Sequence, residues 1–145
     1  MLERRGNPNL KYFVYVRKSS EQKERQKLSI GAQIEKAKEY FGHLDIEIIE
    51  DSKSAFKPEN RAGFRDMIAR IKKGERTGLI AWHPDRLSRN EMDAAIITYF
   101  IRMGIIEDIL FGSYTFTNTP EGIWMLQVAL SQSQYESAKK GRDVK

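Results

Sequence analysis

The segment 12–20 limits the possible folds most, because a wholly apolar run passes directly into charged and hydroxyl side chains. Residues 12–16 are all aromatic or β-branched, which is the composition of a buried strand. Arg17, Lys18 and Ser19 follow at once. Ligands of open α/β sheets bind just beyond the carboxyl ends of the strands. Two interpretations follow: a hydroxyl beside positive charge that attacks a phosphate, or a strand end whose polar side chains are merely solvated.

Strand-like and helix-like segments alternate along the chain. The predicted strands are 11–17, 45–50, 78–82 and 105–111, and the predicted helices are 30–41, 61–73, 91–103 and 120–140. This alternation implies right-handed crossovers between parallel strands. The predicted fold class is therefore α/β, with a mainly parallel sheet of about four to five strands, helices on both faces and a long C-terminal helix. Residues 1–10 are predicted to be a flexible lead-in to a single domain, 11–145.

The predicted helix ends have specific capping residues. Ser29 and Asn60 are expected to cap the first two helices, and Thr119 caps the last, which starts with Pro120. This last helix has two apolar stripes, one of Ile123, Leu126 and Leu130 and another of Trp124, Met125, Val128 and Tyr135. A helix that is apolar on two sides packs against two partners. We therefore expect the second partner to be another subunit.

The composition narrows the possible partners and compartments. The net charge is +5, but residues 1–90 hold 20 basic and 13 acidic residues, whereas 91–145 hold 5 and 7. If nucleic acid binds, the first part should face it. The chain has no cysteine, which excludes disulfides and thiolate metal sites. We find no apolar run of membrane-spanning length and no signal-peptide core, so a cytoplasmic protein fits best.

Three polar clusters follow the first three predicted strands. They are Arg17 with Ser19, Ser54 with Arg61, and residues 85–89, which contain Asp85, Arg86 and Arg89. Four guanidinium groups around one hydroxyl would repel one another unless an anion lay among them. The planar set of donors on each guanidinium matches the oxygens of a phosphate. The clusters together predict phosphoryl transfer without a metal or a cofactor. The simpler alternative is that Asp85 caps a helix starting near Leu87, with both arginines of the third cluster solvated.

The histidines offer little independent chemistry. His83 and Asp85 could form half of a metal site, but an isolated His-x-Asp pair is more often structural. The glycine-rich loops that bind nucleotides are absent from the sequence. No histidine lies within the proposed phosphate clusters, so Ser19 has no obvious general base.

Two of these segments resemble the motifs of a known family, the serine recombinases, which include resolvases, invertases and large serine integrases. Residues 15–20, Tyr-Val-Arg-Lys-Ser-Ser, resemble the nucleophile motif, and residues 85–89, Asp-Arg-Leu-Ser-Arg, resemble the second motif. The resemblance extends from about Lys11 to Lys140, and residues 82–84 favour the large integrases and transposases. Further positions that match the family's active site are Gln22, Ser54, Arg61 and Glu136.

The resemblance implies a mechanism. Ser19 would attack a DNA phosphodiester to form a 5′-phosphoserine, and strand exchange would take place in a synaptic tetramer built from homodimers. Arg17, Arg86 and Arg89 would hold the phosphate with help from Arg61. Asp85 would orient the arginines or take part in proton transfer. No metal and no small-molecule cofactor would be needed, and the gene would belong to a prokaryotic cell, a phage or another mobile element.

The resemblance also implies that catalysis and recognition of the DNA site belong to separate domains. Residues 11–145 would be the catalytic domain with the start of the dimerisation helix, and the domain that reads the DNA site would lie outside this chain. Two alternatives stay open on the same fold. One is a non-catalytic oligomerisation module, and the other is a flavodoxin-like domain that binds a small phosphate ligand.

Overall fold

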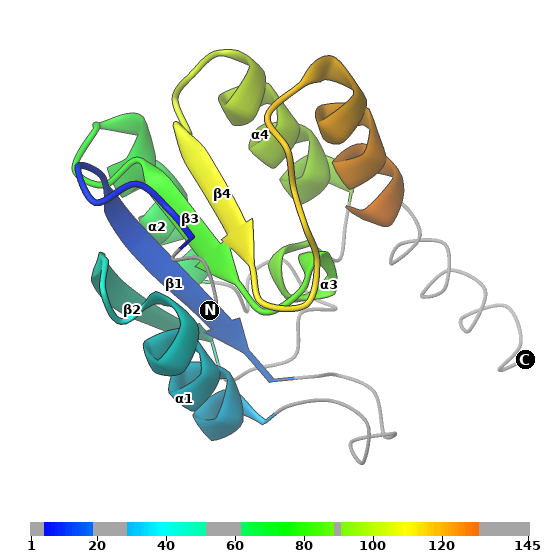
Figure 1. Ribbon diagram of the computed structural model, residues 1–145. Helices are drawn as coiled ribbons and strands as arrows, with labels where there is room; N and C mark the ends of the chain where they lie inside the picture. The colour runs from blue at the N-terminus through cyan, green and yellow to red at the C-terminus, as the bar shows by residue number, and fades with distance from the viewer. Residues whose placement is uncertain (1–4, 19–28, 52–61, 89–90, 131–145) are drawn as a thin grey trace, which may run out of the picture.

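The computed structural model describes residues 5–18, 29–51, 62–88 and 91–130, and these form one parallel sheet flanked by helices (Figure 1). The strands are β1 (Lys11–Arg17), β2 (Asp45–Asp51), β3 (Gly78–Ala81) and β4 (Asp108–Phe111), in the order β2-β1-β3-β4. The helices are α1 (Ile30–Phe41), α2 (Ala62–Lys72), α3 (Pro84–Leu87), α4 (Glu91–Arg102) and a helix over residues 120–130. The predicted fold class is confirmed.

The strand register brings the carboxyl ends of the strands to one edge. Arg17 pairs with Asp51 at the ends of β1 and β2, and Ala81 pairs with Phe111 at the ends of β3 and β4. Within β1, Val14 pairs with Ile80 of β3, so β1 extends beyond β3 at this edge. We call this side of the sheet the carboxyl edge. Figure 1 shows α3 beside it, just after β3.

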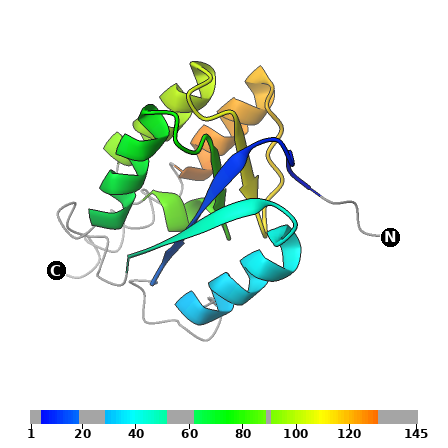
Figure 2. The same ribbon diagram turned by 90° about the vertical axis from the view of Figure 1, so that its left-hand side faces the viewer.

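The central strand β1 separates two hydrophobic cores. Tyr12, Val14 and Val16 pack toward α1, whereas Phe13 and Tyr15 pack toward the other helices. Figure 2 shows α1 on one side of the sheet and α2, α4 and the helix 120–130 on the other. Burial on both faces explains why this strand is apolar throughout rather than alternating.

Three strand boundaries differ from the predictions. β2 ends at Asp51 rather than residue 50. β4 begins at Asp108 rather than residue 105, because the backbone N–H groups of Ile105 and Ile106 donate to the Phe100 carbonyl and so close the end of α4. β3 ends at Ala81 rather than residue 82, shortly before the chain turns into α3. The apolar composition of β3 and β4 therefore extends beyond the paired part of each strand.

Residues 5–10 pack against the fold, which the expectation of a flexible lead-in did not anticipate. Arg5 Nη1 donates to the Phe111 carbonyl at 2.7 Å, and the Asn7 N–H donates to the Tyr12 hydroxyl at 2.8 Å. Gly6 lies so close to Leu44 that an added Cβ would be 2.6 Å from a side-chain carbon. This segment therefore covers part of the sheet on the side of α1.

The helix 120–130 confirms part of the two-stripe prediction. The Thr119 hydroxyl accepts from the Gly122 N–H at 3.0 Å, as expected of its cap. Leu126 and Leu130 are fully buried in the core. Trp124 and Met125, on the second stripe, are 64% and 57% exposed. Tyr135 lies outside the described residues. No described helix combines the length and the hydropathy that crossing a membrane requires.

Candidate active site at the carboxyl edge

Arg17 joins the first and third polar clusters directly. It is the last residue of β1 and its side chain is fully buried. Its guanidinium donates to the backbone carbonyls of Asp85 and Arg86, the latter at 3.2 Å, and to that of Lys18 at 3.3 Å. The planar donor fork of arginine suits such a set of convergent acceptors. The structure therefore holds the start of the nucleophile motif against the second motif, as the parallel topology predicted.

Residues 85–87 of the second motif lie in one short helix, α3, and Ser88 follows at its C-terminal end. α3 begins at Pro84, and the His83 side chain accepts a hydrogen bond from the Asp85 N–H at 3.2 Å. Arg86 is only 2% exposed and Ser88 is fully buried. The simpler interpretation, in which Asp85 caps a helix and Arg86 is solvated, is therefore wrong on both points. Proline occupies the first helical position, so the cap falls to the residue before it.

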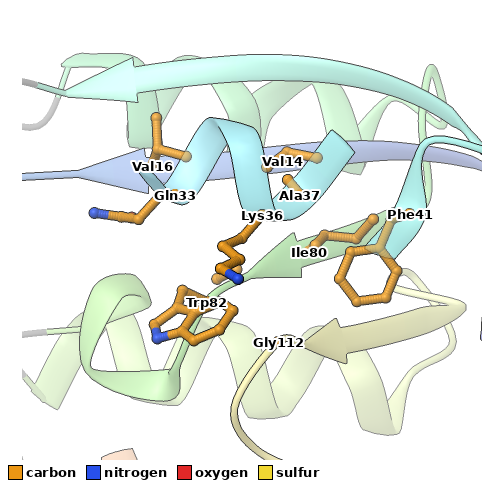
Figure 3. Close-up of a pocket in the computed structure, with 10 residues that line it drawn as sticks. Val14, Val16, Gln33, Lys36, Ala37, Phe41, Ile80, Trp82 and Gly112 are labelled. Atoms are coloured by element: carbon orange, nitrogen blue, oxygen red, sulfur yellow. The ribbon is translucent and has the colours of Figure 1, made fainter. Parts of the chain in front are cut away.

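The backbone that leads into α3 is fixed by the loop after β4. Ser113 donates to the Trp82 carbonyl from both its N–H and its hydroxyl, each at 2.9 Å. Gly112 lies against the Trp82 ring, where an added Cβ would be 2.3 Å from a ring carbon. On the other side, the Trp82 ring stacks on Tyr40 with centroids 6.1 Å apart. Figure 3 shows Trp82 beside Gly112 and facing the Lys36 side chain of α1, in a small pocket that these residues line.

Gln33 is a residue of this edge that sequence reasoning missed. Its amide nitrogen donates to the Arg17 carbonyl at 2.9 Å, and its amide oxygen accepts from the Arg17 N–H at 3.4 Å. Gln33 is 2% exposed, and it thus continues the hydrogen bonding of β1 from the side of α1. The available signal was its position in the helix pattern, since a polar amide lies on the same face as Ile30 and Ala37.

Asp51 is the second residue that sequence reasoning missed. Its Oδ1 accepts from the Gly63 N–H at 2.9 Å, and its Oδ2 accepts from the Phe64 N–H at 3.0 Å and the Tyr15 hydroxyl at 2.7 Å. The side chain therefore supplies acceptors to the first turn of α2, where unpaired N–H groups and the helix dipole favour a carboxylate. The expected cap, Asn60, lies outside the described residues.

Replacing Asp51 with asparagine should destabilise the protein strongly. The substitution is nearly isosteric, but whichever way the amide is turned, its –NH₂ group faces a backbone N–H of α2, either that of Gly63 or that of Phe64. Unsatisfied buried donors cost about 1–3 kcal/mol each, so we expect a loss of about 2–4 kcal/mol in the free energy of unfolding. Urea denaturation monitored by circular dichroism measures this loss.

Asp45 provides the matched control at the other end of the same strand. Its carboxylate is about half exposed and pairs with Arg76 at 2.8 Å. Exposed ion pairs contribute about 0–1 kcal/mol, so Asp45→Asn should change stability by no more than that. Equal losses for the two variants would contradict the role assigned to Asp51.

At the opposite, amino edge of the sheet, basic side chains bind acidic and aromatic groups of the fold itself. Arg70 contacts Glu47 at 2.5 Å and Glu75 at 2.7 Å, and its guanidinium lies 4.8 Å from the centroid of the Phe13 ring. Hydrogen bonding by Arg70 lowers the pKa of Glu47 below its ordinary value. Some of the basic residues in the first 90 positions therefore serve the fold rather than an external polyanion.

The other predicted site residues lie outside the part of the chain that the structure describes. They are Ser19, Gln22, Ser54, Arg61, Arg89 and Glu136. His83 and Asp85 do contact each other, at 3.3 Å between Nδ1 and Oδ1. Among the described residues, however, no group of three or more histidine and acidic side chains is arranged to hold a metal ion.

Known proteins share the sequence pattern of this chain. Residues 12–145 match the family model of the resolvase N-terminal domain. A putative DNA recombinase of Bacillus subtilis (strain 168) is 29% identical over 126 residues, which cover 87% of this chain. The matched region spans only 25% of that relative's length.

Solved structures share the fold at low sequence identity. The N-terminal catalytic domain of TP901-1 integrase superposes with a TM-score of 0.61 at 18% identity, covering 88% of this chain and 97% of that one. The first open reading frame of transposon ISC1904 and a serine recombinase, both from Sulfolobus solfataricus, give TM-scores of 0.55 and 0.53 at 22% identity. They cover 92% and 91% of this chain, and 88% of each of those chains. Because the family model spans nearly the whole sequence, this chain belongs to the serine recombinase family and carries its resolvase N-terminal domain.

Proposed function

We propose that this chain is the catalytic domain of a site-specific recombinase that cuts and rejoins DNA through a covalent link to Ser19. The observation that carries the proposal is the buried guanidinium of Arg17, bonded to the carbonyls of Asp85 and Arg86. This contact holds the strand that leads to Ser19 against the second motif. A nucleophile and its charge-stabilising groups must be brought together in this way before phosphoryl transfer can be catalysed.

In the proposed reaction, the Ser19 oxygen forms a bond to the phosphorus of a DNA phosphodiester and the bond to the 3′ oxygen breaks. The 3′ hydroxyl leaves, and the 5′ phosphate stays on the protein. After strand exchange, a 3′ hydroxyl attacks the phosphoserine and restores both the DNA and the serine. The covalent link preserves the bond energy, so no external energy source is required.

The arginines would supply the positive charge that the transition state requires. We assign Arg17, Arg86 and Arg89 to the phosphate, with Arg61 in support. Arg17 and Arg86 are almost fully buried, so little water would screen their charge from a phosphate bound at this edge. Asp85 would orient these cations or take part in proton transfer, and Gln22, Ser54 and Glu136 would complete the site.

A denaturation-resistant adduct tests the proposal. The complete gene product is incubated with supercoiled plasmid that carries the DNA flanking its gene, and the mixture is denatured in detergent. We expect a fraction of the DNA to remain attached to protein and to be released by protease. Two findings together would contradict the proposal: no adduct, and a rise in melting temperature with inorganic phosphate. They would favour the phosphate-ligand alternative.

We further propose that the chain forms a homodimer through the helix 120–130, and that two dimers form the tetramer in which strands exchange. Trp124 and Met125 are exposed in the monomer and line a shared surface hollow with Pro120 and Glu121. Large exposed apolar groups of this kind mark interaction surfaces. The protein would act in the cytoplasm, where its DNA substrate is found.

Sedimentation should detect this dimer in the wild-type chain. Replacing both Trp124 and Met125 with glutamate should weaken dimerisation by at least about 30-fold, because a central aromatic contact is commonly worth 2 kcal/mol or more. Lys36→Glu, on the opposite face of the sheet, should leave the dimer intact. A wild-type chain that stays monomeric at high concentration would contradict this assignment.

A further inference from the structure

His83 makes two contacts with one nitrogen that a single protonation state cannot satisfy. Its Nδ1 lies 3.2 Å from the backbone nitrogen of Asp85 and 3.3 Å from Oδ1 of the same residue. The hydrogen bond from the Asp85 N–H requires the neutral tautomer with its proton on Nε2, in which Nδ1 accepts and also faces a carboxylate that is itself an acceptor. In the charged ring, Nδ1 carries a proton, so it donates to the carboxylate and no longer accepts from the backbone.

We propose that His83 is a positioning residue that controls the Asp85 carboxylate and makes the second motif sensitive to pH. The inference rests on the proposed function, because Asp85 is assigned there to the arginines or to proton transfer. When His83 is neutral, it caps α3 through the Asp85 N–H. When His83 is protonated, it draws the Asp85 carboxylate toward itself and gives up the cap.

The sequence around Pro84 links the cap of α3 to the position of Arg17. Pro84 has no N–H, so Asp85 provides the first N–H of α3 that the cap can serve. The carbonyls of Asp85 and Arg86 accept from Arg17, which fixes this turn relative to β1. A change at the cap is therefore transmitted to the same two residues that hold the Arg17 guanidinium.

His83 lies in a setting that is open to solvent. Its side chain is 41% exposed, and that of Asp85 is 24% exposed, so water reaches both. The charged groups of this turn are the Asp85 carboxylate, which contacts the ring, and the buried guanidinium groups of Arg17 and Arg86. From the loop after β4, the Tyr114 ring meets His83 edge-on at 6.3 Å, and burial raises the pKa of this phenol, so it stays neutral. Histidine is the side chain whose charge ordinarily changes between pH 5 and 8.

Nuclear magnetic resonance tests the exchange without any DNA. The chain has two histidines, His43 and His83. The substitution His43→Asn leaves His83 as the only histidine in the spectrum and does not alter α3. We expect the Asp85 amide resonance to shift with the same midpoint as the His83 ring. His83→Asn should abolish that shift, because asparagine Oδ1 can replace Nδ1 as an acceptor but does not titrate. An Asp85 amide that does not follow the His83 ring would overturn the proposal.

The adduct assay supplies the functional readout. Between pH 8 and 5.5, we expect the rate of adduct formation to fall about 2–10-fold in the wild type, which corresponds to one hydrogen bond. This fall in rate should be missing in His83→Asn and should be unchanged in His43→Asn. His83→Ala should be slow at every pH because it lacks the cap. Identical pH profiles for the wild type and His83→Asn would overturn the proposal. If no protein forms an adduct and inorganic phosphate raises the melting temperature, the proposed function fails, and the amide titration still decides the role of His83.

Discussion

The Ser19→Ala variant is expected to form no covalent adduct with DNA, whereas Ser20→Ala should form it at close to the wild-type level. The two serines are adjacent in the sequence, and both follow the charged end of β1. Only the hydroxyl that attacks phosphorus can be retained in the product. Loss of a nucleophile usually lowers the rate of a covalent enzyme by a factor on the order of 10³–10⁶. For the adduct itself the loss should be complete.

This pair of variants separates chemistry from folding. Each substitution removes one small hydroxyl and adds no volume, so we expect the melting temperatures of both variants to match the wild type within a few degrees. An adduct formed normally by Ser19→Ala would contradict the assignment. So would an adduct lost only in Ser20→Ala, which would move the nucleophile by one residue.

The Arg17→Lys variant should be both less stable and nearly inactive. Lysine retains the positive charge but has a single nitrogen, so it cannot reach the carbonyls of Asp85 and Arg86 with the geometry of the guanidinium fork. Leaving one or two buried acceptors unpaired should cost about 2–4 kcal/mol in the free energy of unfolding. The displaced α3 turn should also lower the rate of adduct formation by about 100-fold, as misplacement of about 1 Å commonly does.

Lys18→Ala serves as the control for Arg17→Lys. Lys18 is exposed, and its described contacts are made by its backbone. Its N–H donates to the Asp51 carbonyl and its carbonyl accepts from Arg17, each at 3.3 Å, and alanine retains both groups. Its stability should therefore change by no more than about 0.5 kcal/mol. Denaturant unfolding and the adduct assay together test the pair. An active Arg17→Lys variant with wild-type stability would show that the guanidinium does not connect the two motifs.

Residue patterns within single segments were sufficient to predict β1 and α1. The bounds of β1 and α1 agree with the sequence prediction, because the first is an unbroken apolar run and the second has Ser29 as its cap. The Ser29 side chain accepts from the Ala32 N–H at 3.1 Å, as that pattern requires. Parallel pairing then followed from the alternation of strands and helices, and with it the meeting of Arg17 with the second motif.

Features that depend on distant packing were not predictable in the same way. Asp51 lies just beyond the predicted strand 45–50, but it binds the start of α2 and the hydroxyl of Tyr15. Gly78 looks like an ordinary strand residue, yet an added Cβ would be 2.2 Å from the Tyr12 ring. The use of Arg17 to bind backbone carbonyls was also unexpected, since its charge suggested only an anion as partner. Each case depends on neighbours remote in sequence.

The most direct test of the account is to find which residue carries the DNA phosphate. The adduct is digested with nuclease and protease, and tandem mass spectrometry locates the nucleotide on the resulting peptide. We expect a nucleotide attached through its 5′ phosphate to Ser19. A nucleotide on a different residue, or a 3′ phosphate linkage at any position, would contradict it.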